Sequence, residues 1–465
     1  MFEFNLNKHD YNYIHFIGIG GISMSGLAQL LITKGYKVSG SDREDSDIIN
    51  HLRSLGIGIY IGQRKENIKN PDLVIYTDAI PSDNEELIAA KSLGVPVVSR
   101  GVFLGALMKN YSTSIAVSGS HGKSTATSMI SKIFLNSTKD ATILLGGKLK
   151  ELDGNVKVGS EDYLVTEACE YKGNIRYYYP QTVIILNIDE DHLDYYKDLN
   201  DIIDTFKEYL SNQDEDSLTI TNLNEENNKL ILDSVKGKLI TYGQENEDAD
   251  YNAVNIEFDQ LGRPSFDLIF RDGSSHHFEL GVIGRYNINN AMAAIVATYE
   301  NGVDVETIRE NLKTYTGLDR RMQVLGSVDG TTIMTDYGHH PSEIKVTLDA
   351  LKEHTKEKLI CIWQPHTFSR TKLLFDDFLK CFDSADEVII TDIYPAREKF
   401  DPSIHSRDVV DALVKKGINA KYIGEFEDAK EYIYKVIQKD DLVITTGCGN
   451  PDKLAHMIVD DQEER

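Results

Sequence analysis

The chain has 465 residues, of which 41% are hydrophobic, and a formal net charge of −25. Because this length exceeds one ordinary hydrophobic core, we expect two to four domains. The acidic balance argues against a nucleic acid partner, since a phosphate backbone requires a basic face, but it leaves small anionic ligands open.

The apolar runs are the length of strands. The run TVIIL at 182–186 is far too short to cross a bilayer, so we expect no membrane span. Glu3, Lys8 and Asp10 precede the first apolar run, and we expect no signal peptide. The four cysteines lie far apart without a C-x-x-C pair, which fits a reducing cytoplasm better than a disulfide framework or a zinc site. The sequence does not choose between a monomer and a homodimer.

Strand-like and helix-like segments alternate along the chain, which predicts α/β domains with largely parallel sheets. The first region has an expected helix at 23–35 and expected strands at 13–20, 37–42, 73–77 and 96–99. The second has an expected helix at 286–302 and strands beginning near 113, 163 and 182. The third has strands beginning near 331, 359, 387 and 442. We therefore expect three domains, at 1–110, 111–322 and 323–465.

The first region contains a glycine-rich loop, GIGGISMSG, between an expected strand and an expected helix. Gly18, Gly20 and Gly21 allow a tight turn and a close approach to a phosphate. Asp42 ends the next strand, at the place where a dinucleotide-binding fold has the acidic residue that binds the ribose. Ser23 stands where the strict pattern has glycine. The loop indicates a diphosphate-containing ligand, not necessarily NAD, and the alternative is a tight turn that holds no ligand.

A second glycine-rich loop, GSHGKST, follows the apolar strand at 113–118. Gly119 and Gly122 precede Lys123, which would hold the β- and γ-phosphates together with backbone N–H groups. The Ser124 hydroxyl would bind Mg²⁺. Val117 stands where the full P-loop pattern has glycine, so this is a shortened loop. The alternative is an ordinary turn with a surface lysine.

Two later strand ends carry candidate metal ligands. The strand YLVTE ends on Glu167, and the segment from 182 runs to His192. Because the carboxyl ends of parallel strands share one edge of a sheet, both side chains are expected beside the second loop. Mg²⁺ prefers oxygen ligands, so a solvated or capping role is the alternative for His192. Glu170 competes with Glu167, which we prefer because it lies nearer the strand end.

The third region has polar residues at two successive strand ends. Asp336 precedes a tyrosine and two histidines, before an expected helix start at Pro341. His366 and Arg370 follow the next strand. Arginine binds carboxylate or phosphate through paired hydrogen bonds, so these stretches are candidates for an anionic substrate site. Helix capping and loop packing are the alternative explanation.

Taken together, these stretches resemble the Mur ligases, which add amino acids to the peptidoglycan precursor. The resemblance covers essentially the whole chain, with the motifs in the family's order. They are HFIGIGGISMSGLAQLL, VSGSD, GSHGKST, EACEY, NIDEDHLDYY, GRYNINNAMAA, GLDRRMQVLG, DYGHHPSEI and QPHTFSRT. Single motifs are weakly specific, whereas the ordered set is highly specific.

The resemblance implies a Rossmann-like UDP-binding N-terminal domain, a central P-loop ATPase-type domain and a C-terminal Rossmann-like domain that brings the amino acid. It also answers why one chain has two such loops, since the family uses one for the UDP diphosphate and one for ATP. The implied reaction uses ATP and Mg²⁺ to phosphorylate the lactyl carboxylate of UDP-N-acetylmuramate. The amine of an amino acid, expected to be L-alanine, then attacks the acyl phosphate.

The resemblance also implies roles for individual residues. The implied ATP-binding residues are Gly119, Ser120, His121, Gly122, Lys123, Ser124, Thr125, Asn287, Asn290 and either Arg320 or Arg321, of which we prefer Arg321. The implied metal ligands are Ser124, Glu167 and His192. The implied substrate-binding residues are Gly18, Gly20, Gly21, Ser23, Asp42, His339, His340 and Arg370. The implied catalytic residues are Lys123, His192, His366 and Arg370.

Some positions depart from the family pattern. Tyr286 stands where histidine is common before Asn287, and Thr367 where arginine is common after His366.

Within the family, the rival is the ligase that joins a ready-made tripeptide to UDP-N-acetylmuramate, although the segment DYGHH favours alanine addition. From other classes, an NAD-dependent oxidoreductase would leave the second loop unexplained, and the retained loop lysine argues against a non-catalytic nucleotide sensor.

Overall fold

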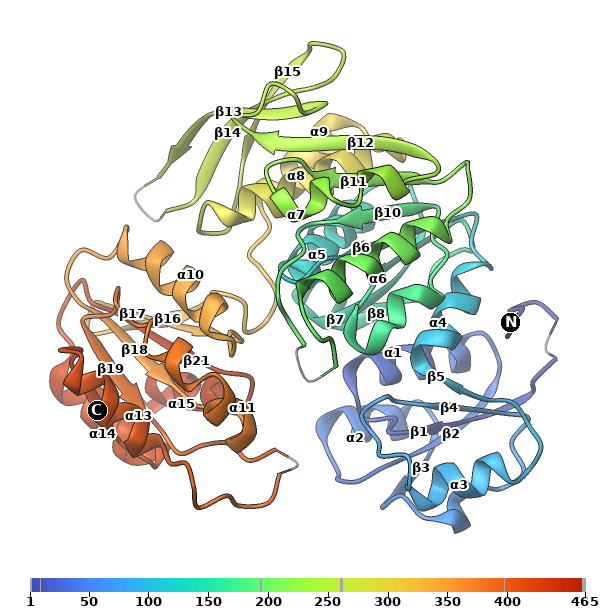
Figure 1. Ribbon diagram of the computed structural model, residues 1–465, viewed down its shortest axis with the longest axis horizontal. Helices are drawn as coiled ribbons and strands as arrows, with labels where there is room; N and C mark the ends of the chain where they lie inside the picture. The colour runs from blue at the N-terminus through green and yellow to red at the C-terminus, as the bar shows by residue number, and fades with distance from the viewer. Residues whose placement is uncertain (1, 9, 193–194, 260–261, 397, 462–465) are drawn as a thin grey trace. The chain divides into compact units, whose positions relative to one another are not determined.

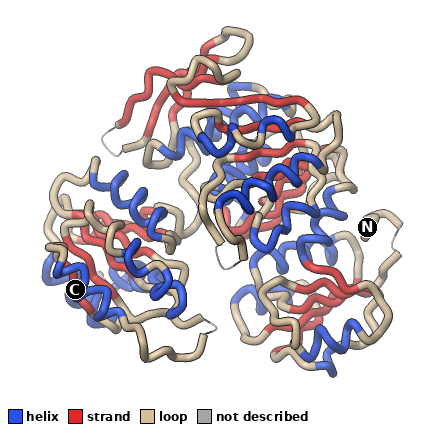
Figure 2. The backbone as a smooth tube through the Cα atoms, viewed as in Figure 1, coloured by secondary structure: helices blue, strands red, loops and turns tan. Residues whose placement is uncertain are grey.

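The computed structural model describes residues 2–8, 10–192, 195–259, 262–396 and 398–461. The chain forms two compact units, each built of strands with helices around them (Figures 1 and 2). The first unit contains Met1–Ile256, Phe266–Glu279 and Ile288–Tyr315. The second contains Glu257–Ser265, Leu280–Asn287 and Thr316–Arg465. Three sheets are present in the described residues, two of them mainly in the first unit.

The first sheet has the strand order β3-β2-β1-β4-β5, and its four neighbouring pairs are parallel. The order reverses beside β1, and at such a point the carboxyl ends of the strands open a crevice for a ligand. Apolar residues of the first helix pack with β1 and β2 in one buried core. The elements are β1 (Tyr13–Ile17), α1 (Ile22–Thr33), β2 (Lys37–Asp42), α2 (Asp47–Ser54), β3 (Gly58–Ile61), η1 (Lys65–Asn67), β4 (Leu73–Tyr76), α3 (Glu85–Lys91), β5 (Val97–Ser99) and α4 (Arg100–Met108).

The second sheet has the order β15-β14-β13-β12-β11-β10-β6-β9-β7-β8. Strand β6 pairs in parallel with β10 and β9, so the loop after β6 lies between two other strand ends. The first elements are β6 (Thr113–Ser118), α5 (Lys123–Leu135), β7 (Ala141–Leu149), η2 (Lys150–Leu152), β8 (Gly154–Lys157), β9 (Tyr163–Glu167), η3 (Tyr171–Tyr177), β10 (Thr182–Ile185), α6 (Leu199–Ser211) and β11 (Leu218–Asn222). The remaining elements are α7 (Glu226–Lys229), η4 (Leu232–Ser234), β12 (Lys238–Gln244), β13 (Tyr251–Phe258), β14 (Pro264–Ile269), β15 (Ser275–Glu279), α8 (Tyr286–Glu300) and α9 (Val305–Lys313).

The third sheet has the order β16-β17-β21-β18-β19-β20. Its buried Trp363 packs on Phe378 and Phe382, with ring centroids 4.5 and 5.4 Å away. The expected helix start at Pro341 is confirmed. The elements are β16 (Gln323–Val328), β17 (Thr331–Asp336), α10 (Pro341–Lys352), β18 (Leu359–Trp363), α11 (Phe368–Leu373), α12 (Phe375–Phe378), β19 (Glu387–Ile390), α13 (Ser406–Lys415), β20 (Ala420–Tyr422), α14 (Phe426–Val436), β21 (Leu442–Thr446) and α15 (Pro451–Asp460).

The expectation of largely parallel sheets holds around the glycine-rich loops and fails in at least two places among the described residues. Strand β7 pairs antiparallel with β8, and β16 pairs antiparallel with β17. Both pairs join consecutive strands through short connections, which antiparallel strands allow and parallel strands do not. Of these four strands, only β17, which begins at Thr331, was expected from the sequence, and β7, β8 and β16 were missed.

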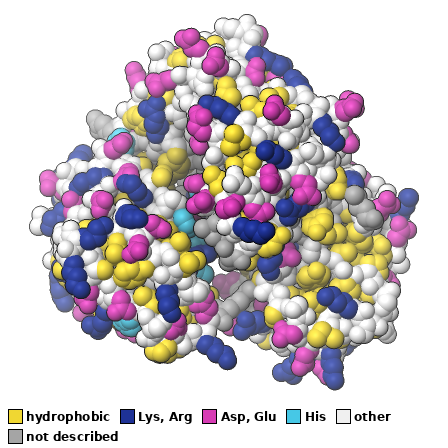
Figure 3. Space-filling model, in the orientation of Figure 1, with side chains coloured by type: hydrophobic (Ala, Val, Ile, Leu, Met, Phe, Trp, Pro, Cys, Tyr) yellow, Lys and Arg dark blue, Asp and Glu magenta, His cyan; other side chains and the backbone are white. Residues whose placement is uncertain are grey.

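The visible surface carries acidic and basic side chains interspersed over its whole area (Figure 3). In the described parts of the chain, no helix combines the length and the apolar character needed to cross a membrane. The expected domain boundaries near 110 and 322 stay a prediction.

Candidate active site

Helices α1 and α5 begin without a side-chain cap, as do α7, α11, α12, α14 and α15. Helix α1 starts after Gly21 and α5 after Gly122, and neither has an acidic residue in its first turn. By contrast, the N-cap side chains of α2, α3, α4, α6 and α9 accept hydrogen bonds from their first turns. The first amides of a helix need an acceptor, and the positive end of the helix favours an anion. Both glycine-rich loops predicted from the sequence therefore end at helix starts suited to phosphate.

The first loop turns tightly at Gly18, whose φ is +83°. The N–H groups of Gly18 and Ile19 donate to the carbonyl of Ser41, at 2.8 and 2.9 Å. The Gly20 N–H donates to Asp42 Oδ2 at 2.8 Å, and a Cβ on Gly20 would lie 2.9 Å from that oxygen. Asp42, which the sequence predicts to bind a ribose, thus bonds the loop itself and fixes its shape. Its predicted contact with a substrate stays a prediction.

Ser23 lies in the first turn of α1. Its hydroxyl accepts a hydrogen bond from the Arg100 guanidinium at 3.4 Å. This contact brings a cation to the start of the helix, which suits an anionic ligand there.

A buried polar network lies beneath the first loop, and sequence reasoning missed it. His15 and Glu86 are fully buried, and His15 Nε2 lies 2.8 Å from Glu86 Oε1. The other Glu86 oxygen accepts from the Ser41 hydroxyl at 2.5 Å, while His15 Nδ1 lies 2.7 Å from Ser39 Oγ. Because the Ser41 carbonyl holds the loop, this network positions it. The alternation of polar residues at 39 and 41 was the available signal.

The second loop is held on its neighbouring strand end. Gly119 and Gly122 have φ of +131° and +84°, in the region that favours glycine. The Ser120 N–H donates to the Asn187 carbonyl at 3.0 Å, and the His121 N–H donates to Asn187 Oδ1 at 2.8 Å. Backbone and side chain of one asparagine therefore fix the turn.

Further contacts complete the second loop. The Ser120 hydroxyl accepts from the Asp189 N–H at 2.8 Å. Thr125 lies in the first turn of α5. A Cβ on Gly122 would lie 2.4 Å from Asn290 Oδ1, so Asn290 packs closely on the loop, and its ATP-binding role stays a prediction. Asn287 donates through its side chain to the Ile283 carbonyl at 2.8 Å.

Lys123 is occupied by protein acceptors. Its Nζ donates to the carbonyls of Gly119 and Ser120, at 2.6 and 3.0 Å, and to Glu170 Oε1 at 3.0 Å. Burial would lower the pKa of Lys123, but the Glu170 charge outweighs burial and raises it. Burial would likewise raise the pKa of Glu170, and Lys123 with His192 holds it below its usual range. Lys123 and Glu170 are therefore a buried, charged pair.

The structure separates the predicted metal ligands into two groups. Glu167 ends β9, as predicted, and its Oε2 accepts from the Ser124 hydroxyl at 3.0 Å. Its other oxygen accepts from the Gly146 N–H at 2.8 Å. His192 lies instead beside the competitor Glu170, with 3.5 Å between Nε2 and Oε1.

Glu170, Asp191 and His192 offer ligand atoms that all lie within 4.8 Å of one another. Burial would lower the pKa of His192, but Glu170 and Asp191 raise it. Mg²⁺ prefers oxygen ligands, which Ser124 and Glu167 both supply, whereas the other group includes an imidazole. The donor set thus favours Ser124 with Glu167, and the assignment stays a prediction. Leu193 and Asp194, in the same motif, lie outside the described residues.

In the second unit, the two candidate arginines differ. Arg320 donates to the carbonyls of Gly447 and Gly449, both at 2.9 Å, and lies 3.4 Å from Asp452. Arg320 is therefore a structural tie, which leaves Arg321 as the better candidate for a ligand. Both guanidinium groups lie over the Tyr337 ring, at 4.9 and 5.1 Å.

Tyr286, which stands where the family commonly has histidine, lies in the same unit. Burial raises the pKa of Tyr286, Asp336 raises it further, and Arg321 opposes them. Burial also raises the pKa of Asp336, whose oxygens accept from the Met322 and Gly338 N–H groups at 2.9 and 2.7 Å. Asp336 thus shapes the turn after β17, and the adenine contact expected near Tyr286 stays a prediction.

His366 and His339 face each other, with ring centroids 6.4 Å apart. Burial, then the charge of Arg370, lowers the pKa of His366 to about 4. Burial also lowers the pKa of His339, with Arg370 adding to it and Glu343 opposing it. Both imidazoles are therefore neutral at pH 7, and each offers one donor and one acceptor. His339 and His366 thus come together after β17 and β18, and Arg370 lies close enough to lower the pKa of both.

Two further predicted positions serve helix starts. His340 is the N-cap of α10, and its side chain accepts from the Ser342 N–H. Thr367 is the N-cap position of α11, with its hydroxyl 3.1 Å from that of Ser369. Arg370 lies within α11, not at the strand end itself. A substrate-binding role for His340 stays a prediction beside this capping role.

These features define a multidomain α/β nucleotide-binding protein with two phosphate-type loops. Three family profiles match the chain in order: "Mur ligase family, catalytic domain" at 13–112, "Mur ligase middle domain" at 117–298, and "Mur ligase, glutamate ligase domain" at 320–449. The chain belongs to the Mur ligase family. Its three-domain α/β fold confirms the expected fold class.

Named relatives extend this similarity over the full length. The UDP-N-acetylmuramate–L-alanine ligase of Alkaliphilus metalliredigens is 44% identical over 459 residues, covering 99% of both chains. The crystal structure of UDP-N-acetylmuramate-alanine ligase MurC from Thermotoga maritima has a TM-score of 0.81 at 26% identity, covering 97% of this chain and 99% of that one. MurF from Thermotoga maritima, solved with ADP, shares the fold at 16% identity and a TM-score of 0.63, covering 92% of this chain and 96% of that one.

Proposed function

We propose that the protein is an ATP-dependent ligase that joins L-alanine to the lactyl carboxylate of UDP-N-acetylmuramate. The observation that carries this proposal is the 44% identity, over 99% of both chains, to a protein named as that ligase. The glycine-rich loops, the α8 asparagines and the histidine pair lie within this full-length match. Neither the tripeptide ligase nor the NAD-dependent oxidoreductase has comparable support.

The chemistry explains why two nucleotide sites are needed. A carboxylate resists nucleophiles because its charge is delocalised and oxide is a poor leaving group. Its oxygen attacks the γ-phosphorus of ATP, which breaks the bond to ADP and forms an acyl phosphate. The alanine amine then attacks the acyl carbon, the amide bond forms, phosphate leaves and the amine loses a proton. Holding the three substrates together removes much of the entropy barrier.

We assign the α1 loop to the UDP diphosphate and the α5 loop to ATP. Lys123 supports the second assignment because it is the cation at an uncapped helix start. Its ammonium is held by Glu170 and two loop carbonyls, so contact with ATP phosphates requires it to exchange at least one of these partners. Glu170 keeps the lysine protonated until that exchange.

Mg²⁺ is part of the same proposal. The Ser124 hydroxyl and the Glu167 carboxylate are adjacent oxygen donors at the start of α5, which suits this ion. When bound, Mg²⁺ would neutralise charge on the phosphate oxygens. The Gly146 N–H orients Glu167 for this role.

In the second unit, we assign the anionic end of the incoming amino acid, or the acyl phosphate, to Arg370. A guanidinium binds either group through paired hydrogen bonds. His339 and His366 are neutral beside it, so they can donate to the same anion without repelling the arginine. We also propose a cytoplasmic enzyme, in keeping with the four free cysteines.

The test is an assay of phosphate release with UDP-N-acetylmuramate, ATP and Mg²⁺, in which the third substrate is varied. L-alanine should support turnover, with glycine and L-serine as near competitors. One methyl group is worth roughly 1–3 kcal/mol, so discrimination against glycine should be modest. An enzyme that uses a tripeptide and ignores L-alanine would overturn the proposal in favour of the recycling ligase.

A further inference from the structure

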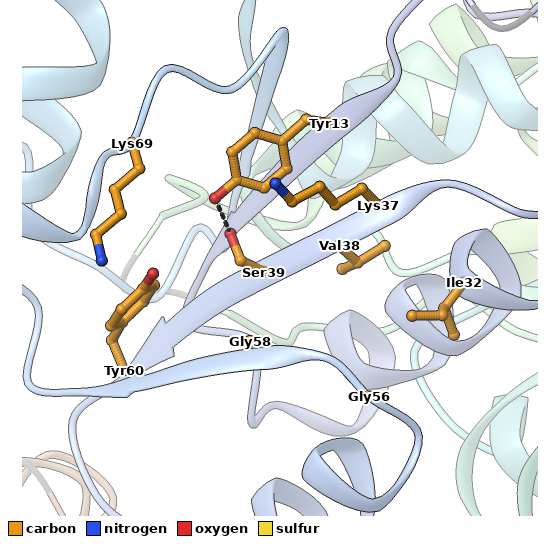
Figure 4. Close-up of a pocket in the computed structure, with 9 residues that line it drawn as sticks. All are labelled: Tyr13, Ile32, Lys37, Val38, Ser39, Gly56, Gly58, Tyr60 and Lys69. Atoms are coloured by element: carbon orange, nitrogen blue, oxygen red, sulfur yellow. Dashed lines mark hydrogen bonds between the residues drawn. The ribbon is translucent and has the colours of Figure 1, made fainter.

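A cavity lies at the end of the first sheet opposite its glycine-rich loop. It encloses about 340 Å³ and is shown in Figure 4. Tyr13, Lys37 and Gly58, the first residues of β1, β2 and β3, line it, whereas the loop follows the last residue of β1. The cavity is therefore separate from the residues assigned to either nucleotide.

The strand pattern leaves this part of the sheet open. Side chains alternate between faces, so Ser39 of β2 and Tyr60 of β3 lie on the same face as Tyr13. Gly58 has no side chain there, and a Cβ added to it would contact Ser39 at 3.6 Å. Apolar residues of α3 pack with β1 and β4 in a small core, away from β2 and β3. A glycine thus exposes a polar floor that no helix of that core covers.

Two lysines flank the cavity, and both point toward it in Figure 4. Lys37 Nζ lies 4.5 Å from the centroid of the Tyr13 ring, and Lys69 Nζ lies 4.9 Å from that of Tyr60. Among the described residues, neither lysine lies within ion-pair distance of a carboxylate. In a chain of net charge −25, two cations at one cavity without acidic partners are a local excess of positive charge.

The floor of the cavity is fixed from beneath. Ser39 Oγ lies 2.8 Å from the Tyr13 hydroxyl and 2.7 Å from His15 Nδ1. His15 is in turn held by the buried Glu86. The two hydroxyls are therefore pre-positioned to bond a ligand that the lysines attract, which lowers the cost of ordering them.

We propose that this cavity is a binding site for a small phosphate-bearing molecule. Two ammonium groups match a dianion, and lysine binds phosphate as a compact point charge. The volume is at the low end for pockets that hold small organic ligands, so it accommodates a phosphate together with a small ring. The tyrosine rings provide faces for that ring. The same chemistry occurs in free phosphate and in a phosphate ester, and the experiment distinguishes them.

The test is calorimetric titration of the full-length protein saturated with ADP and UDP, so that both glycine-rich loops are occupied. The probes are glucose 6-phosphate, inorganic phosphate and uncharged glucose. The decisive variant is Lys37→Met with Lys69→Met, which keeps the apolar stems and removes two charges. The matched control is Lys8→Met with Lys91→Met, which removes two exposed lysines of the same region that do not line the cavity.

Glucose 6-phosphate should bind the wild type and the control equally, and glucose should not bind. In the decisive variant its affinity should fall about tenfold, because both ammonium groups that attract the phosphate are removed. Tighter binding of the ester than of phosphate identifies an ester site, and equal binding identifies a free-phosphate site. Unchanged affinity in the decisive variant, or no phosphate-dependent heat in the wild type, overturns the proposal. Neither result depends on ligase activity.

Discussion

Glu167, the last residue of β9, and Glu170, which follows that strand, should have separable roles. Glu170 is 1% exposed and lies 3.0 Å from Lys123 Nζ, whereas Glu167 is partly exposed and bonds neutral donors. We therefore expect Glu170→Gln to destabilise the protein, and Glu167→Gln to change its stability little. Conversely, Glu167→Gln should raise the Mg²⁺ concentration needed for turnover far more than Glu170→Gln.

The magnitude follows from the contacts. Removing one partner of a buried ion pair costs about 3–5 kcal/mol, because the other charge is left uncompensated. Glutamine keeps an acceptor for Lys123, which still donates to two carbonyls, so we expect about 2–3 kcal/mol for Glu170→Gln. Glutamine at 167 can still accept from the Gly146 N–H, and its amide NH₂ can donate to the Ser124 hydroxyl in place of the bond it loses, so its cost should stay below about 1 kcal/mol.

The loss should also depend on pH in a defined direction. The folded protein holds the pKa of Glu170 below its usual value of 4.5. Its stabilisation is therefore fully present above that value and is lost as pH falls through the folded pKa. The difference in stability between wild type and Glu170→Gln should be constant from pH 8 to about pH 6 and should shrink in acid.

The assay is urea unfolding of wild type and both variants at pH 7 and pH 4, combined with Mg²⁺ titration of phosphate release. Equal midpoints for wild type and Glu170→Gln at pH 7 would contradict the role of the buried pair. A larger Mg²⁺ requirement for Glu170→Gln than for Glu167→Gln would move the metal to the group of Glu170, Asp191 and His192. Each carboxylate thus serves as the control for the other.

Four other changes test the remaining assignments. Lys123→Ala should nearly abolish phosphate release, while the affinity for UDP-N-acetylmuramate, measured by calorimetry, stays within about twofold of the wild type. Loss of that affinity with retained turnover would reverse the assignment of the two loops to UDP and ATP. Glu86→Gln should raise KM for UDP-N-acetylmuramate more than KM for ATP, because Glu86 supports the first glycine-rich loop and not the second; an equal rise would indicate general unfolding. The wild type should lose folding stability between pH 6.5 and 4, because the unfolded chain protonates His366 in that range while the folded protein, which lowers the pKa of this imidazole, still holds it neutral. His366→Gln should reduce that loss. An unchanged pH profile from urea unfolding would contradict this. Thr367→Arg should lower KM for L-alanine severalfold with little change in kcat, as expected for added ground-state binding; initial rates that fall at all alanine concentrations would refute it.

Short stretches of sequence were enough to predict the loops and the helices that follow them. Gly18 and Gly122 adopt the left-handed backbone that glycine favours, and Pro341 begins α10, as expected. Glu167 was placed at the end of β9 because strand length and alternation are encoded within a few residues. The order of such motifs along the chain was sufficient for the family resemblance, which the full-length comparisons confirm.

The tertiary structure alone decided which polar groups meet. Lys123 pairs with Glu170, 47 residues away, and His15 pairs with Glu86, 71 residues away. Neither contact follows from local pattern, because it depends on which strands become neighbours and where the chain turns between them. Burial then sets the charge, since removing these groups from water is tolerated only when each has its partner. Local backbone preference is therefore readable from the sequence of this protein, whereas the pairing and protonation of its buried polar side chains arise only when distant segments exclude water together.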